Sequence, residues 1–154
     1  MNAMNAMNAD NIYLDTSALL PYYREEPSSR QVEKLLNKTQ PPVLLSELTR
    51  VEMASSIARW TRMNEIDEPQ AALIENTFEQ DTHSGLYLVR PLHSTHYHLA
   101  EKWLSARKTT LRTLDALHIA CCWNFGAKLV TCDNVMHKAA GMLGLESLLI
   151  GGAG

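Results

Sequence analysis

The alternation of short apolar runs with longer stretches of helical period is the feature that most constrains the fold of this chain. Apolar runs of strand length recur at residues 12–14, 43–46, 87–89, 128–131 and 148–150. Stretches of helical period lie between them, at residues 49–62, 68–80, 94–105, 114–125 and 135–142. This alternation is typical of a parallel sheet covered by helices. We therefore expect an α/β fold whose central parallel sheet has four to five strands.

Several helical segments carry local signals. Pro21 should end a short helix that begins near Ser17, and Ser28 or Ser29 should cap the next helix. Residues 49–62 and 68–80 should pair as a hairpin. Residues 114–125 are apolar nearly all round, and Gly126 stands where a left-handed cap belongs. That last segment should be a buried helix facing the sheet.

The length of 154 residues fits one domain with a sizeable core. Residues 1–9 read MNA three times, a low-complexity pattern that cannot bury a face, and Met4 or Met7 could be the true start. No other repeat and no linker interrupts the sequence. We therefore expect a low-complexity N-terminal tail at 1–9 and a single domain at 10–154.

Charge and cysteine content limit the function classes. The formal net charge is -3, so no global positive field indicates a nucleic-acid partner, and any RNA contact must be local. The three cysteines are too few for a disulfide framework and form no C-x-x-C pair. No apolar run approaches the roughly 18 residues of a membrane span, and no signal peptide is recognisable. We expect a cytoplasmic protein with reduced thiols and no membrane contact.

Two aspartates follow strands of the predicted sheet. Asp15 comes directly after the run 12–14, and Asp133 lies two residues after the run 128–131. Either residue could merely cap the following helix. Because ligands of parallel sheets collect at the carboxyl ends of the strands, the two side chains together also indicate a site at that edge.

Two further acids stand in helical segments. Asp115 falls in the first turn of an apolar helix, where an unpaired charge costs several kcal/mol unless a partner compensates it. Glu52 shares a helix face with small residues, with Glu47 as its rival and Arg59 as a possible solvent-side partner. If Asp15, Glu52, Asp115 and Asp133 converge, they require a hard divalent cation such as Mg²⁺ or Mn²⁺. Such an ion would support hydrolysis of a phosphodiester.

Four sequence blocks contain these acids in order. They read Y-L-D-T-S-A-L from Tyr13, L-L-S-E-L-T-R-V-E-M-A-S-S-I-A-R from Leu44, L-R-T-L-D-A-L-H-I-A-C from Leu111 and L-V-T-C-D-N from Leu129. Together they resemble the signature blocks of PIN-domain nucleases, above all the bacterial toxins of the VapC type. The resemblance spans residues 12–149, nearly the whole chain.

The resemblance implies a PIN fold, a Mg²⁺- or Mn²⁺-dependent endoribonuclease, inhibition by a cognate antitoxin and a homodimer. It assigns catalysis and metal binding to four acids: Asp15, Glu52, Asp115 and Asp133. Thr131 matches a hydroxyl residue that supports the site, and Ser17 lies beside the first acid. Val135 stands where some members carry a further acid, so the resemblance leaves open whether one ion or two are bound.

A short basic run and several histidines accompany the acids. Arg107, Lys108 and Arg112 precede Asp115 and could contact an RNA backbone, although a solvated loop is the simpler explanation of a charge run. His93, His96 and His98 lack the cysteine or carboxylate that would complete a zinc set, so we expect surface histidines. His118, three residues after Asp115, is expected to be a core histidine whose hydrogen bonds are satisfied.

Other functions remain as alternatives. The same fold could process RNA outside a toxin system or cleave DNA. A purely interacting module would use the acids only as caps and salt-bridge partners. A phospho-acceptor signalling domain would need paired acids after the first strand, whereas Asp15 is followed by Thr16 and Ser17.

Overall fold

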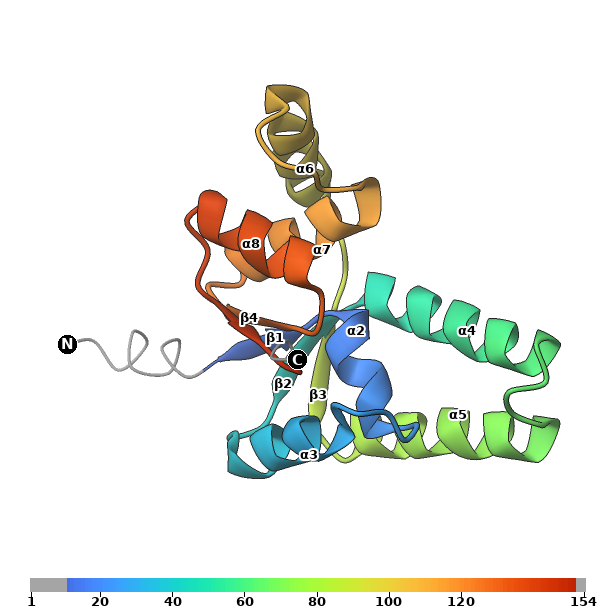
Figure 1. Ribbon diagram of the computed structural model, residues 1–154. Coiled ribbons are helices and arrows are strands. Elements are labelled where there is room, and N and C mark those ends of the chain that lie inside the picture. Colours follow the sequence, from blue (N-terminus) through green and yellow to red (C-terminus); the bar gives the residue numbers. More distant parts are fainter. Residues whose placement is uncertain (1–10, 152–154) are drawn as a thin grey trace.

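The computed structural model describes residues 11–151, which form a five-stranded parallel sheet (Figure 1). The strand order is β3-β2-β1-β4-β5, so the first strand in sequence lies at the centre. All four neighbouring pairs are parallel. The strands are β1 Ile12–Leu14, β2 Val43–Ser46, β3 Tyr87–Arg90, β4 Lys128–Thr131 and β5 Ser147–Leu149. The predicted parallel α/β sheet is confirmed, with the fifth strand at its edge.

Helices cover both faces of this sheet (Figure 1). One face carries α2 Thr16–Leu19, the 3₁₀ helix η1 Leu20–Tyr22, α3 Ser29–Lys38, α4 Glu47–Arg62 and α5 Glu68–His83. The other face carries α6 Ser94–Ala106, α7 Thr113–Asn124 and α8 Asn134–Met142. Side chains alternate across β1, so that Leu14 belongs to the first core and Tyr13 to the second. The fold is therefore two apolar layers separated by one sheet.

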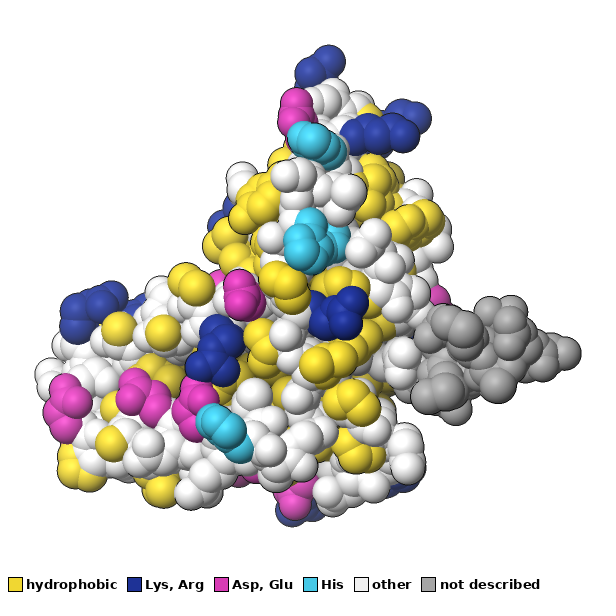
Figure 2. Space-filling view, turned by 180° about the vertical axis from the view of Figure 1, so that it is seen from behind, with side chains coloured by type: hydrophobic (Ala, Val, Ile, Leu, Met, Phe, Trp, Pro, Cys, Tyr) yellow, Lys and Arg dark blue, Asp and Glu magenta, His cyan; other side chains and the backbone are white. Residues whose placement is uncertain are grey.

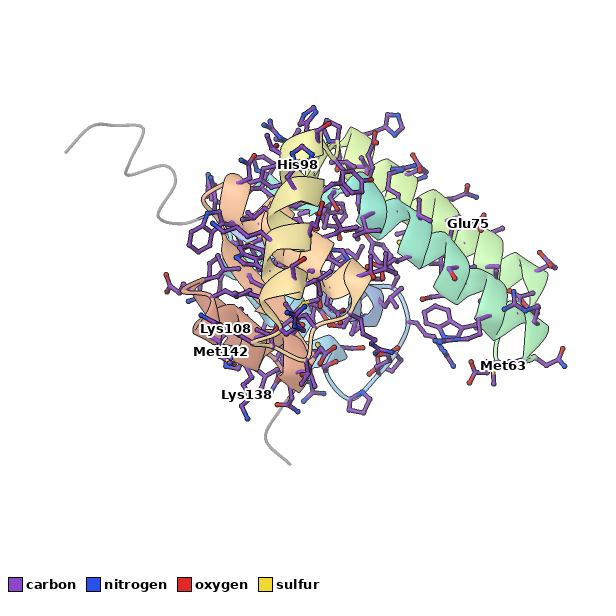
Figure 3. The ribbon with its side chains drawn as sticks, turned by 90° about the horizontal axis from the view of Figure 1, so that it is seen from above. Met63, Glu75, His98, Lys108, Lys138 and Met142 are labelled. Carbon is purple, nitrogen blue, oxygen red and sulfur yellow. The ribbon has the colours of Figure 1, made fainter. Side chains whose placement is uncertain are left out.

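The hairpin of α4 and α5 projects away from the sheet (Figure 1). Trp60 and Ile66 close its far end as buried residues, and Met63 at its tip is exposed. Seen from above, Met63 lies far from Lys138 of α8 (Figure 3). The predicted hairpin is confirmed, although α4 begins two residues earlier than expected, where the Ser46 amide donates to Thr49 Oγ1 over 3.5 Å.

Helix α7 is the buried helix that the sequence predicts. Every residue from Ala116 to Cys122 is buried, and these residues pack under the sheet with β1 and β4. Gly126 ends the helical segment with a φ of 65°, in the left-handed region where glycine carries no Cβ penalty. Cys121 and Cys122 are free thiols inside this layer, as expected.

Two local expectations need correction. Pro21 does not end a helix: α2 stops at Leu19, and Pro21 lies in the first turn of η1, where its missing N–H is not needed. His93 and His98 are exposed as expected, but His96 is only 1% exposed. Its Nδ1 accepts from the His93 amide at 2.9 Å, and its Nε2 bonds Asn124 Oδ1 at 3.1 Å. Burial is tolerated because both ring nitrogens have partners.

The tail predicted at 1–9 lies outside the described residues. Within residues 11–151, no helix is long and apolar enough to cross a membrane.

Candidate active site

Asp15 follows β1 directly and is 3% exposed, at the carboxyl edge of the sheet. Its Oδ1 accepts from the Ser17 hydroxyl at 2.8 Å and from the Ala18 amide at 3.1 Å, which caps α2. Its Oδ2 accepts from the Thr131 hydroxyl at 2.7 Å. Burial raises the pKa of Asp15, and His118 and these three donors oppose the rise without cancelling it. The side chain is thus held in one orientation while its charge is only partly compensated.

Thr131 and Ser17 tie the ends of β1 and β4 together. Thr131 Oγ1 accepts from the Asp133 amide at 3.0 Å while it donates to Asp15. Ser17 Oγ accepts from the Cys132 amide at 2.9 Å. These bonds exist because the two strands are parallel neighbours, with Leu14 opposite Val130. The two predicted supporting residues therefore lie against the first predicted acid.

Asp133 lies beyond β4 and caps α8. Its Oδ1 accepts from the amides of Val135 at 2.8 Å and Met136 at 3.3 Å. The capping interpretation is therefore correct for both Asp133 and Asp15, as far as it goes. Capping uses only one oxygen of each carboxylate for the helix amides, which leaves Asp133 Oδ2 without a hydrogen bond to the described residues.

Asp115 occupies the first turn of α7, near Asp133. Its Oδ2 accepts weakly from the Arg112 amide, at 3.4 Å. Burial raises the pKa of Asp115, and the negative charge of Asp133 adds to the rise, while Arg112 and His118 oppose it. The repulsion shows that two of the predicted acids from separate helices face one region.

Glu52 reaches the same region from the second turn of α4. One oxygen, Oε1, accepts from the Thr16 hydroxyl at 2.8 Å and from Nε2 of His118. Burial acts to raise the pKa of Glu52, but the interaction with His118 and the Thr16 hydroxyl outweigh burial and leave the pKa below its usual value. The solvent-side pairing with Arg59 considered from the sequence is not formed, and Glu47, the rival acid, is exposed.

His118 is the functional candidate that the sequence interpretation undervalued. It is 2% exposed, as expected for a core histidine, and its Nδ1 lies 2.6 Å from the Tyr13 hydroxyl. That hydroxyl also lies 2.9 Å from Ser46 Oγ. The ring thus connects a buried phenol to the carboxylate of Glu52. The signal was present in the sequence, because three residues after Asp115 the side chain returns to the same helix face.

The basic run of Arg107, Lys108 and Arg112 is less closely connected to the acids than Ser17, Thr131 and His118 are. Arg107, Lys108 and Arg112 are all exposed, and none forms an ion pair within the part of the chain that the structure describes. Arg112 lies near enough to Asp115 to oppose the rise in its pKa. On the face seen from behind, Lys and Arg side chains are spread over several elements rather than gathered in one patch (Figure 2).

By chemical type, the four carboxylates fit a hard divalent cation, because such ions prefer oxygen ligands. The pKa values of two of these carboxyl groups, Asp15 and Asp115, are raised. In arrangement, the expectation of one tight acidic cluster is not met. Between residues 11 and 151, no three His, Cys, Asp or Glu side chains are positioned to hold a metal ion. Asp15, Glu52 and Asp133 instead bond to hydroxyls, helix amides and His118, each acid with at least one oxygen.

The sequence model of the PIN domain family matches residues 12–142. Among curated proteins, none matches the sequence significantly. The match covers all four acids, both supporting hydroxyls and His118.

Solved structures of similar fold include three bacterial proteins. The crystal structure of FitAcB from Neisseria gonorrhoeae aligns with a TM-score of 0.70 and 18% identity, over 89% of this chain and 96% of that one. VapC20 of Mycobacterium tuberculosis, described as a Sarcin-Ricin loop cleaving toxin, aligns with a TM-score of 0.64 and 15% identity, over 84% and 95%. A toxin-antitoxin complex from Klebsiella pneumoniae aligns with a TM-score of 0.59 and 16% identity, over 90% and 96%. At these identities the likeness establishes the fold alone.

Proposed function

This chain belongs to the PIN domain family, and from that premise we propose that it is an endoribonuclease that requires Mg²⁺ or Mn²⁺. The proposal rests mainly on the environment of Asp15. A buried carboxylate with a raised pKa is held by the hydroxyls of Ser17 and Thr131, on the strand end next to Asp133. Perturbed acids of this kind cluster at functional sites.

The acids have distinct roles in this proposal. In this proposal Asp15, Glu52, Asp115 and Asp133 would hold the cation. Two observations support it: Asp15 and Asp133 follow the neighbouring strands β1 and β4, and His118 interacts with Asp15, Glu52 and Asp115. The bound ion supplies two effects, a lower pKa of water and compensation of charge on the phosphodiester. Ser17 and Thr131 position Asp15 before substrate arrives, so that little reorganisation is needed.

The reaction is an in-line hydrolysis. A water oxygen attacks phosphorus and loses a proton, the bond from phosphorus to the 3′ oxygen breaks, and that oxygen takes up a proton. The products are a 5′-phosphate and a 3′-hydroxyl end. In this proposal Arg112, with Arg107 and Lys108 in the loop before it, contacts the RNA backbone; the support is that all three are exposed and that Arg112 acts on the pKa of Asp115.

We also propose that the protein is the toxin of a toxin-antitoxin pair, bound by a cognate antitoxin and acting as a homodimer. Support comes from the neighbours of similar fold, one of which is described as a toxin and one as a toxin-antitoxin complex. Co-expression with the protein encoded by an adjacent small gene, followed by co-purification, tests the pairing. Failure of every neighbouring product to bind or inhibit the enzyme would favour a role in RNA processing.

The decisive experiment compares cleavage of one RNA oligonucleotide with Mg²⁺, with Mn²⁺ and with EDTA. We expect cleavage only with a cation, and loss of at least about 100-fold in Asp15→Asn, which keeps the side-chain shape but removes the charge. A DNA oligonucleotide of the same sequence tests the alternative substrate. Equal cutting in EDTA would rule the mechanism out.

A non-catalytic interaction module is the second candidate, because Asp15 and Asp133 do cap α2 and α8. If the acids were only caps, Mn²⁺ would leave the melting temperature unchanged. A cation that binds the folded protein alone must raise it, by an amount that grows with concentration. The Asp133→Asn variant is the matched control, because asparagine also caps a helix but is a weaker cation ligand.

A further inference from the structure

His118 is buried in the apolar layer of α6, α7 and α8, although a hydrophobic side chain would fill that place without needing partners. Both of its ring nitrogens have partners, Tyr13 on one side and Glu52 on the other. No side-chain N or O buried within residues 11–151 lacks a hydrogen bond. The ring is therefore fixed by two specific contacts rather than by packing alone.

The direction of these hydrogen bonds follows from the chemistry of the partners. Glu52 Oε1 is a carboxylate oxygen that accepts from Thr16, so Nε2 of His118 carries the proton that it donates. Burial raises the pKa of Tyr13 well above its ordinary value, so the phenol keeps its proton and donates it to Nδ1. We assign this tautomer from the network. A relay of Ser46, Tyr13, His118 and Glu52 thus crosses the sheet edge.

The relay engages only one oxygen of Glu52. Oε1 takes the bonds from both Thr16 and His118, whereas Oε2 accepts none from the described residues. The Glu52 side chain is 26% exposed, and its partner Thr16 directly follows Asp15 in the chain, so Oε2 is the oxygen left for a further ligand on the side of Asp15.

We propose that His118 is a positioning residue that anchors Glu52 through Oε1, so that Oε2 remains available as the ligand for the divalent cation. This inference rests on the proposed function and adds a residue to it. A group that orients a metal ligand without touching the metal has a measurable effect on metal affinity, typically 10–100-fold. A residue with only a packing role changes stability and leaves the affinity alone.

The experiment measures the Kd for Mn²⁺ by isothermal titration calorimetry on the full chain, with the melting temperature in EDTA recorded for each variant. His118→Leu removes the donor, and His118→Gln keeps an amide N–H that can reach Glu52. The matched control is His96→Leu, because His96 is as deeply buried but bonds the His93 amide and Asn124.

We expect His118→Leu to weaken Mn²⁺ binding by about 10-fold or more, and His118→Gln to restore most of it. His96→Leu should lower the melting temperature and leave the Kd unchanged. An unchanged Kd in His118→Leu, an equal loss in His96→Leu, or no rescue by glutamine overturns the proposal.

If His118→Leu does not fold, Tyr13→Phe decides the question, because it removes only the hydroxyl that orients the ring. A weaker Mn²⁺ affinity in folded Tyr13→Phe supports the proposal, and an unchanged affinity overturns it. Failure of the proposed function is distinguishable, since the unmodified chain would then neither bind Mn²⁺ nor cut RNA. That outcome removes the role of His118 together with the metal site.

Discussion

Helix α7 contains one buried histidine and bonds a second, and the two rings have different partners. In the second turn of the helix, His118 contacts the Tyr13 hydroxyl and the carboxylate of Glu52. At its end, Asn124 bonds His96, whose other nitrogen accepts a backbone amide. Burial is nearly the same, at 2% and 1% exposed. The comparison teaches that burial alone does not distinguish the two histidines, whereas the charged partner of His118 does, and our proposal for His118 rests on that partner.

The largest contrast is expected in catalysis. Asp115→Asn removes a charge at the first end of α7, and kcat/KM for RNA cleavage should fall by about 100-fold or more. Asn124→Ala, at the other end, should leave kcat/KM within about twofold, because among residues 11–151 the Asn124 side chain bonds only His96. Steady-state cleavage of a labelled oligonucleotide measures both. Equal losses at the two ends would break the comparison.

The next contrast is between the pairwise coupling energies of the His118–Glu52 contact and the His96–Asn124 contact. A double-mutant cycle of His118→Gln and Glu52→Gln in urea unfolding should give a coupling of about 1.5–3 kcal/mol, as for hydrogen bonds to a charged group. The Glu52 side chain is partly exposed, which favours the lower end of that range. A coupling near zero would mean that the contact does not stabilise the fold.

The corresponding cycle at the other end should give less. His96→Leu and Asn124→Leu remove both partners of a neutral hydrogen bond, and we expect a coupling of about 0.5–1.5 kcal/mol. The same urea titrations provide the measurement. A coupling larger than that of His118 and Glu52 would reverse the assignment of roles.

The smallest expected effect is electrostatic. Asp133→Asn removes the negative charge that helps to raise the pKa of Asp115, so that pKa should fall while remaining governed by burial. NMR titration of the side-chain carboxyl carbons detects the change. Asn124→Ala, at the far end of α7, is the control that should leave the Asp115 pKa unchanged.

The same pKa shift has a consequence for stability. A carboxyl whose pKa is raised in the folded state binds its proton more tightly there, so its contribution to the free energy of unfolding is present at low pH and is lost as pH rises through the raised pKa. Because Asp133→Asn should lower the pKa of folded Asp115, it should narrow the pH range over which this contribution to the free energy of unfolding is lost. Thermal melts across the acid range measure this, and a wider range in the variant would contradict the sign.

Local pattern was sufficient to predict much of this molecule. The strands β1 and β4, the burial of α7 and the left-handed Gly126 follow from apolar period and cap chemistry. Asp15 and Asp133 were predictable at one edge because parallel neighbours end together.

The contacts that bring Glu52 and His118 together were not predictable in this way. They are 66 positions apart in sequence and belong to helices on opposite faces of the sheet. The burial of His96 was missed for the same reason, because Asn124 lies 28 positions away. The tight acidic cluster was expected from the placement of the acids after strands and from the family resemblance, whereas in the structure hydroxyls and helix amides bond several of the carboxylate oxygens.

The central place of β1 in the sheet bears on how the protein is made. During translation Asp15 and Glu52 emerge early, but β1 is completed on one side only by β4, whose residues come more than a hundred positions later. Until then Asp15 has no Thr131 to orient it. A nascent chain therefore carries acidic residues without the edge that we propose to be catalytic, and that edge can form only when synthesis is nearly finished.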